Sequence, residues 1–211
     1  TLELHQSTPP TPGQAEKQPL VLPIAVALVG EQGRIGDEQL LVMNAEKASF
    51  TLQAEPGPEA PALSLLRRFS APVNVQLEQP LQESLQLLAH DDDPFSRWDA
   101  GQRLARQVLL ARAADQPDAT VETALISALR QRLSAYGGSG GQDLAILLAL
   151  PGTAELEALQ NPVDPLALYA ARREWIADLG RHLSEPLHRL LERCRGDWAQ
   201  AWPEGQGARS L

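Results

Sequence analysis

The sequence predicts a two-sheet antiparallel β-sandwich followed by an all-α body of helical hairpins. Up to about Glu78, apolar side chains stand at every second position in short runs separated by turns, which is typical of strands with one buried face. Beyond Glu78, apolar side chains recur at steps of three and four, which is typical of amphipathic helices. We therefore predict two domains, a β-sandwich over residues 1–78 and a helical domain over residues 79–211.

The clearest strand pattern covers residues 20–28, where every even position from Leu20 to Leu28 is apolar. Pro23 lies on the opposite face and lacks an N–H, so we expect an edge strand, or a strand that begins or bulges there. Three glycines, Gly30, Gly33 and Gly36, then provide a chain reversal. A nucleotide-binding loop is not expected at these glycines, because a strand pattern follows them rather than a helix whose N-terminus could hold a phosphate.

Other short strands are expected on both sides of this one. Leu2 and Leu4 already alternate at the start of the chain, and the proline-rich segment 55–61 should interrupt the sheet. Because the chain starts within a strand pattern and ends with what reads as a loop and the first residues of a helix, we expect a piece of a longer protein, with Gln206–Leu211 weakly helical at most. The remaining strands are predicted at residues 39–43, 50–52, 63–69 and 73–77.

The helical part should contain a long helix that starts at Pro94. The aspartates Asp91–Asp93 bring negative charge to the helix N-terminus, Asp93 can cap its free amides, and Pro94 suits the first helical position. Phe95 and Trp98 are predicted to seat the helices against the end of the strand region. The expected buried face consists of Phe95, Trp98, Ala105, Val108 and Leu109. Four polar residues should lie largely elsewhere: Arg97, Gln102, Arg103 and Arg106.

Further helices are expected over residues 81–90, 118–136, 142–150 and 154–159. The longest helical pattern starts at Asp164, and Pro186 is expected to divide it from a last helix that runs through Cys194. The predicted face of the long helix consists of Leu166, Tyr169, Arg173, Ile176, Leu179 and Leu183. Helix pairs joined by short loops predict a stack of hairpins or an irregular superhelix.

Composition excludes several classes of function. The 211 residues carry a net charge of −9 without clustered lysines and arginines, which argues against binding to nucleic acid or to an anionic membrane. The longest apolar stretch, Leu20–Val29, contains a proline and is too short to span a bilayer. The single cysteine, Cys194, cannot form an internal disulfide and fits a reducing compartment, so a cytoplasmic protein is expected.

No constellation of residues predicts catalysis, cofactor binding or metal binding. None of the four histidines begins a His-Glu-x-x-His motif, and Pro186 separates His182 from His188, so these two are not spaced as metal ligands on one helix face. Cys194 is expected to be a packed thiol, and Asp91–Asp93 lack the spaced acceptors of a calcium loop. Gly137–Gly141 lacks the lysine of a phosphate loop. The tryptophans Trp175, Trp198 and Trp202 are expected in a core or lining a groove.

Three blocks of sequence resemble the bacterial aminopeptidase N family, zinc metallopeptidases of the gluzincin class. Phe69–Val73 is similar to the final strand of that family's third domain, and Asp93–Ala100 is similar to the first helix of its fourth domain. The blocks follow in the family's order, and the likeness runs over nearly the whole chain. The first block, which resembles the start of the third domain, comprises Gln6–Pro9, Thr11–Gln14, Lys17–Leu20 and Pro23-Ile24.

The resemblance implies an immunoglobulin-like sandwich, here without its first strand, followed by the opening part of a helical superhelix. The family removes N-terminal residues from peptides with a zinc-bound water, a glutamate base and a Gly-Ala-Met-Glu-Asn motif. None of these is present, since the sole methionine, Met43, stands between Val42 and Asn44. The resemblance therefore assigns zinc to other domains of the parent enzyme and no catalytic, cofactor or metal residue to this chain.

Two functions remain open at this point. The first is a non-catalytic part of the aminopeptidase that spaces and caps the catalytic domain and restricts peptide access, with the other domains of its parent chain as partners. The second is a stand-alone module in which a sandwich and a helical repeat recruit a protein partner.

Overall fold

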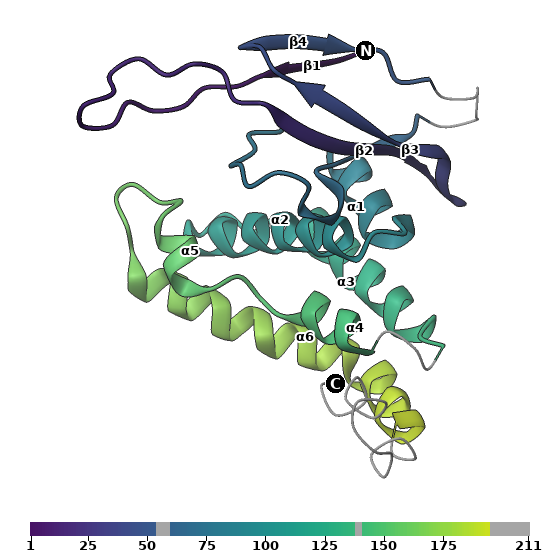
Figure 1. Ribbon diagram of the computed structural model, residues 1–211. Helices are drawn as coiled ribbons and strands as arrows, with labels where there is room; N and C mark the ends of the chain where they lie inside the picture. Colours follow the sequence, from purple (N-terminus) through teal and green to yellow (C-terminus); the bar gives the residue numbers. More distant parts are fainter. Residues whose placement is uncertain (54–59, 138–140, 195–211) are drawn as a thin grey trace, which may run out of the picture.

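The fold places a β-sheet region against a layered set of helices. The structure, a computed structural model, describes residues 1–53, 60–137 and 141–194. Figure 1 shows the strands on one side and the helices stacked beneath them. The predictions for Trp198, Trp202 and Gln206–Leu211, and most of the prediction for residues 55–61, fall outside the described residues.

The strands form two antiparallel sheets, as predicted. One sheet pairs β1 (Leu2–His5) with β4 (Lys47–Phe50). The other places β2 (Leu22–Gly30) between β3 (Gly33–Met43) and β5 (Ala62–Leu65). Next to the turn, Gly30 at the end of β2 pairs with Gly33 at the start of β3. The two glycines therefore close a tight hairpin, as the sequence predicts.

The central strand β2 is buried on both faces, whereas the sequence predicted one. Ile24 and Val26 pack toward the other sheet, in a core that includes Met43. Val29 packs instead into the core of the helices, which cover the second face of the sheet. Leu20, predicted to belong to the buried face, lies before the strand and is 52% exposed. The alternation of apolar residues predicted the strand, but the burial of its second face depends on the helices that cover it.

Pro23 lies near the start of β2, one of the positions predicted for it. It stands opposite Val42 of β3, and β5 pairs with β2 only from Val26 onward. The N–H of Ala25 donates to Ser70 Oγ at 2.9 Å on the side away from β3. In a strand, the N–H groups of residues i and i+2 point to the same side. An N–H at position 23 would therefore also point away from β3. The proline therefore removes no bond of the β2–β3 ladder.

The predicted strand over residues 73–77 is wrong, since the described part of the chain shows no ladder there. Phe69, predicted within a strand, lies in the 3₁₀ turn η1 (Arg67–Phe69). Leu66, Arg68 and Phe69 all have left-handed φ values near 55°. This sharp turn takes the chain out of the sheet before it reaches the helices, so the alternating residues that follow have no neighbouring strand to pair with.

The helices follow the predicted starts closely. Asp93 caps α2 through the N–H of Ser96, and Asp118 caps α3 through the N–H groups of Thr120 and Val121. The predicted dividing role of Pro186 is wrong, because α6 continues through it. The helices are α1 (Leu81–His90), α2 (Pro94–Ala113), α3 (Ala119–Ser134), α4 (Gly141–Leu148), α5 (Thr153–Glu157) and α6 (Pro165–Cys194).

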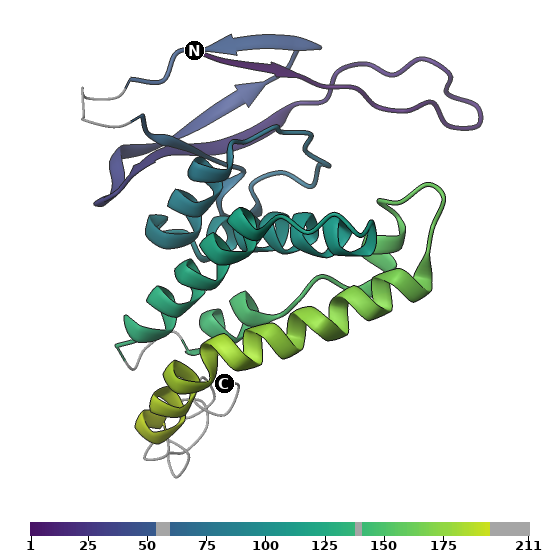
Figure 2. The same ribbon diagram turned by 180° about the vertical axis from the view of Figure 1, so that it is seen from behind.

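Helix α2 is the centre of the helical part. It contacts α1, α3, α4 and α6, and Figures 1 and 2 show it between the sheet and the lower helices. Ala105, Val108 and Leu109 are buried, as predicted. Gln102, predicted to lie away from the core, is also buried, because its amide donates to the carbonyl of Ala149 at 2.7 Å after α4. A hydrogen bond to a distant segment made this burial possible.

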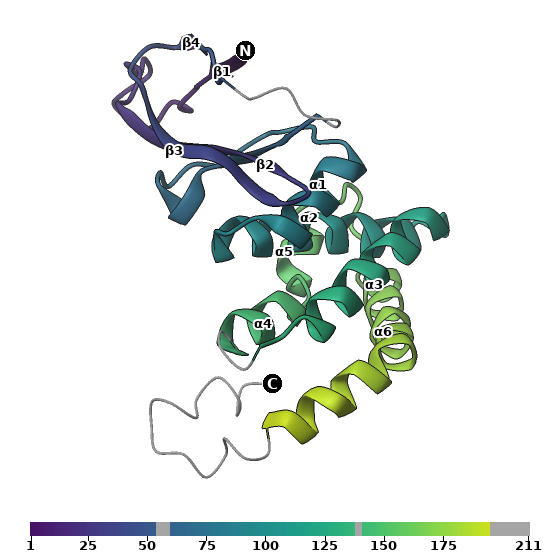
Figure 3. The same ribbon diagram turned by 90° about the vertical axis from the view of Figure 1, so that its right-hand side faces the viewer.

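Helix α6 continues through Pro186 because its freed carbonyl finds another donor. A proline at 186 leaves the carbonyl of His182, four residues earlier, without its helical N–H. Arg130 of α3 donates to this carbonyl through Nη2 at 2.6 Å. Figure 3 shows α6 changing direction toward its C-terminal end, where Pro186 lies. The proline bends the helix, and the contact from α3 replaces the lost hydrogen bond.

The predicted buried face of α6 is wrong in its first half, whereas Leu183 is buried and Leu179 packs against the core, as predicted. Leu166 is 81% exposed, and Tyr169 and Ile176 are exposed as well. Trp175, by contrast, is fully buried, as predicted for a core tryptophan. The core face repeats at helical spacing through Leu168, Ala171, Trp175, Leu183 and Leu190. Within the described residues, no helix is long and apolar enough to cross a bilayer.

Candidate functional site

A buried cluster of charges joins the sheet region to the helices. Its centre is Arg67 of η1, which is 3% exposed. The guanidinium donates from Nε to Glu38 Oε2 at 2.8 Å, from Nη1 to Asp91 Oδ1 at 2.6 Å and from Nη2 to Asp92. We call Arg67, Glu38, Asp91 and Asp92 the Arg67 cluster. Its members come from β3, η1 and the loop between α1 and α2, so the cluster spans both parts of the chain.

The backbone of the sheet places two of these residues. The register of β2 with β3 shifts between Val26, opposite Gln39, and Leu28, opposite Ile35. The extra residues of β3 form a bulge at Gly36, whose φ is 67°, and this bulge carries Glu38 toward Arg67. The left-handed turn at Leu66 and Arg68 then directs the side chain of Arg67 into the junction.

The three aspartates between α1 and α2 have different roles. Asp93 accepts from the N–H and hydroxyl of Ser96, as predicted for a cap, and also from the N–H of Arg68 at 3.0 Å. Asp91 is buried and accepts from Arg67 and from the N–H of Asp93. Asp92 pairs with Arg67 and with Arg34 of β3 at 3.1 Å. The predicted capping by Asp93 is therefore confirmed, and the pairing of Asp91 and Asp92 with Arg67 was not predicted.

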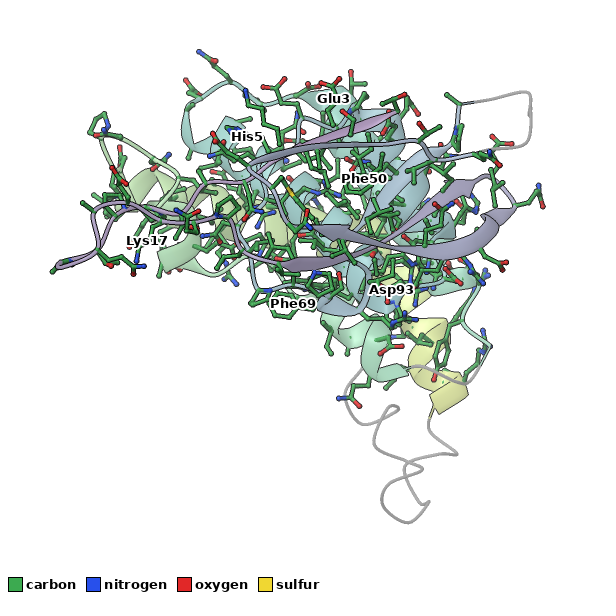
Figure 4. All side chains as sticks on the ribbon, turned by 45° about the horizontal axis from the view of Figure 1, so that its top comes forward. Glu3, His5, Lys17, Phe50, Phe69 and Asp93 are labelled. Atoms are coloured by element: carbon green, nitrogen blue, oxygen red, sulfur yellow. The ribbon has the colours of Figure 1, made fainter. Side chains whose placement is uncertain are left out.

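Aromatic contacts close the same junction. The ring of Phe69 meets Phe95 of α2 edge-on, with centroids 5.5 Å apart, and Phe95 meets Trp98 at 5.7 Å. The predicted seating of the helices is confirmed for Phe95, whereas Trp98 supports the ring of Phe95 from within the same helix. In Figure 4, Phe69 and Asp93 lie on the side of the sheets that faces the helices, whereas Glu3 and His5 lie on the far side.

A cavity of about 520 Å³ lies beside these rings, between the end of the sheet region and α2 and α5. Its walls are mainly apolar and include Phe69, Val75 and Phe95, with Arg103 and Arg106 of α2 at the polar side. Burial lowers the pKa of Arg103, the charge of Asp99 opposes this, and the charge of Arg106 adds to it. Ser96 also lines the cavity, but its hydroxyl is held by the helix-capping Asp93, so the described lining supports packing between the two parts rather than chemistry.

The Arg67 cluster holds its charges despite burial. Burial lowers the pKa of Arg67, but hydrogen bonds to Glu38, Asp92 and Asp91 raise it above its ordinary value overall. For Asp92, burial raises the pKa, while the hydrogen bond and charge of Arg67 and the charge of Arg34 lower it overall. A buried arginine with three carboxylates is strongly paired, and the loss of one partner leaves an uncompensated charge.

Acid should weaken the contribution of Asp92 to stability. Because its folded-state pKa lies below the ordinary value of about 3.9, this contribution is complete above that value and is lost as the pH falls through the lower folded-state pKa. We expect the urea midpoint of Asp92→Asn to fall below wild type at about pH 7 and to approach it at about pH 2. Asp37→Asn, at an exposed position of β3, should match wild type at both pH values, and a pH-independent gap for Asp92→Asn would contradict this.

The residues considered earlier for metal binding do not converge. His182 and His188 lie exposed on α6, and His5 contacts Glu46 at the far end of the sheet region. In residues 1–53, 60–137 and 141–194, no group of three or more His, Cys, Asp or Glu side chains is placed to hold a metal ion. The side chain of Cys194 falls outside the described residues. The Arg67 cluster was not predicted, although Arg67-Arg68 and Asp91–Asp93 are charge runs of opposite sign.

Comparisons with known proteins agree with this architecture. Residues 1–78 match the family model described as a domain of unknown function, DUF3458, with an Ig-like fold. Residues 81–211 match the model described as a domain of unknown function, DUF3458_C, with ARM repeats. The predicted immunoglobulin-like sandwich followed by a helical repeat region is thereby confirmed.

Curated relatives with this arrangement are aminopeptidases. The chain is 40% identical to aminopeptidase N of Caulobacter vibrioides over 79% of its own length and 19% of the relative. It is 32% identical to that of Escherichia coli, covering 89% of this chain and 22% of the relative, and 30% identical to that of Haemophilus influenzae, covering 92% and 23%. The chain thus spans about a fifth of the length of these relatives.

A solved structure gives the same relationship. The crystal structure of Legionella pneumophila aminopeptidase A in complex with aspartic acid superposes with a TM-score of 0.73 and 25% identity, over 90% of this chain and 23% of that one. The chain therefore belongs to the DUF3458_C family of ARM-repeat domains, carries a DUF3458 Ig-like domain before it, and is related to one part of bacterial aminopeptidase N.

Proposed function

We propose that this chain is a non-catalytic part of a zinc aminopeptidase that removes N-terminal residues from peptides. In this role the sheet region spaces the helices from the catalytic domain, and the helices help to restrict which peptides enter. The observation that carries the proposal is the Arg67 cluster, which fixes the two parts of the chain to each other. A spacer must hold a constant geometry, and domains joined by a polar, solvated interface would move relative to each other.

Exposed apolar side chains support contacts with further domains. Leu40 and Val42 lie exposed on β3, and Leu166, Tyr169 and Ile176 lie exposed along one face of α6. Apolar groups that cluster on a surface are commonly covered by another protein segment. We propose that other domains of the parent chain cover these surfaces, that those domains hold the zinc, and that the enzyme acts on peptides in the cytoplasm.

The same exposed surfaces would serve a stand-alone binding module. The gene sequence on either side of this chain distinguishes the two functions. An upstream His-Glu-x-x-His motif with a distal glutamate would identify the zinc-binding domain of an aminopeptidase. Its absence would favour the module.

The purified 211-residue chain should have no aminopeptidase activity, even with added zinc. The expected result is no release of product from an aminoacyl reporter, because the proposal places the zinc ligands and the general base in other domains. The full-length gene product, assayed in parallel, should hydrolyse the same reporter in a zinc-dependent manner. Hydrolysis by the isolated chain, or an inactive full-length product with zinc bound, would overturn the proposal.

A further inference from the structure

A second cavity, of about 260 Å³, lies at the start of α2, next to the end of α3 and the start of α4. Two arginines, Arg97 of α2 and Arg132 of α3, line it together with Pro94 and Asp143. The helices fix both arginines, since each belongs to a helix that packs on α1. The cavity is distinct from the larger cavity at the aromatic rings, and it adjoins the Arg67 cluster through the contact of Arg97 with the backbone of Asp91.

Among the residues that the structure describes, the two guanidinium groups have no carboxylate partner. Arg97 Nη1 donates to the backbone carbonyl of Asp91 at 2.6 Å, and Arg132 Nη1 reaches the carbonyl of Ala89 at 3.4 Å, which is too long for a strong bond. Among the described residues, neither arginine has a carboxylate oxygen within the 4.0 Å of an ion pair. The Nε of Arg132 is buried and has no hydrogen-bond acceptor in the described part of the chain.

Two other inward-facing arginines, Arg67 and Arg112, are paired with carboxylates. Arg67 donates to three carboxylates, and Arg112 donates to both oxygens of Glu122 and pairs with Asp178 at 2.7 Å. Arg97 and Arg132 instead line the same cavity. Burial lowers the pKa of Arg132, and the charge of Arg97 lowers it further. An anion in the cavity would offset the repulsion between the two like charges.

We propose that Arg97 and Arg132 bind a small, singly charged oxyanion in this cavity, namely a carboxylate group or a monoanionic phosphate. The guanidinium group offers paired donors that match the two oxygens of such a group. With one negative charge from Asp143, the lining carries a net charge of about +1, which fits a monoanion. This site does not depend on the proposed role of the chain in a peptidase.

Titration of the isotope-labelled 211-residue chain tests the site directly. The side-chain Nε–H NMR signals of Arg97 and Arg132 are followed while sodium acetate, in one series, and sodium phosphate, in another, replace sodium chloride at constant ionic strength. We expect both signals to shift along one saturable curve. Saturation with acetate alone identifies a carboxylate site, with phosphate alone a phosphate site, and with both a general oxyanion site.

Variants separate this site from general charge effects. Arg97→Gln and Arg132→Gln should each weaken binding about tenfold or more, because each removes a charge-assisted hydrogen bond. Asp143→Asn should tighten binding by removing the nearby negative charge. Arg173→Gln, which removes an exposed arginine of α6 that does not line the cavity, should leave the affinity unchanged.

Three results would overturn the site. The first is a change in signal position that stays linear with anion concentration in both series. The second is a signal position in acetate and phosphate equal to that in chloride alone. The third is an equal loss of affinity in Arg173→Gln and Arg132→Gln. If either variant at the cavity does not fold, the wild-type titration and the Asp143→Asn variant still decide the outcome. An unchanged affinity in Asp143→Asn would also count against the proposed position of the anion.

Discussion

Replacing Arg67 with methionine should lower the free energy of unfolding by about 3–5 kcal/mol, as expected when one partner of a buried ion cluster is removed. Methionine fills a similar length of space but removes the guanidinium, which leaves Asp91 with the N–H of Asp93 and Glu38 with Arg68 as their remaining donors. Asp91 has a fully buried carboxylate, so water cannot replace the lost partner. Urea denaturation followed by circular dichroism measures the loss.

Arg68→Met is the matched control for this variant. The neighbouring side chain is 70% exposed and pairs with the same Glu38, so its loss should cost less than about 1 kcal/mol. Equal effects of the two substitutions would show that the buried cluster does not hold the junction. In the full-length protein, Arg67→Met should change the ratio of kcat/KM for a long peptide to that for an aminoacyl reporter, whereas Arg68→Met should not.

Trp175→Ala should destabilise the helical part by about 3–5 kcal/mol, because truncating a buried aromatic residue leaves a large cavity. The ring is fully buried in the core shared by α2, α3 and α6, and the guanidinium of Arg112 lies 4.9 Å from its centroid. The substitution therefore removes both apolar burial and the aromatic partner of the arginine that joins these helices. Thermal and urea unfolding of the purified chain measure the change.

Ile176→Ala, one residue further along α6, provides the comparison. Ile176 is exposed, so its truncation should cost less than about 1 kcal/mol. A larger loss for Ile176→Ala than for Trp175→Ala would mean that the face predicted from the sequence, rather than the face through Trp175, is the one that packs in solution.

Local signals explain why most helix positions could be predicted from the sequence. Asp93 before Pro94 and Asp118 before Ala119 define helix starts without any tertiary information. The face of α6 could not be predicted in the same way, because apolar residues occur on two of its sides. The continuation of α6 through Pro186 depends on Arg130, which lies 56 positions earlier and belongs to another helix.

Strands depend more strongly on the rest of the chain. The alternation in β2 marked a strand, but the similar alternation of Val73, Val75 and Leu77 did not, because the turn at Arg67–Phe69 takes that segment away from any partner. The Arg67 cluster has the same origin. Its three carboxylates lie 24 to 29 positions from Arg67 in the sequence, and a bulge in β3 and a left-handed turn bring them together with it. The Arg67-Arg68 run and the Asp91–Asp93 run have opposite charges, but the sequence does not indicate which of these residues pair.

The contact between Arg130 and the carbonyl of His182 also determines where the last part of α6 points. Eight residues of α6 follow Pro186, and at the usual rise per residue they form a helical segment about 12 Å long. A small rotation of the helix at the proline displaces its C-terminal end by a larger distance. The side chain of Arg130 connects this point of α6 to α3. A single arginine thus steers the direction in which the polypeptide leaves the helical layers.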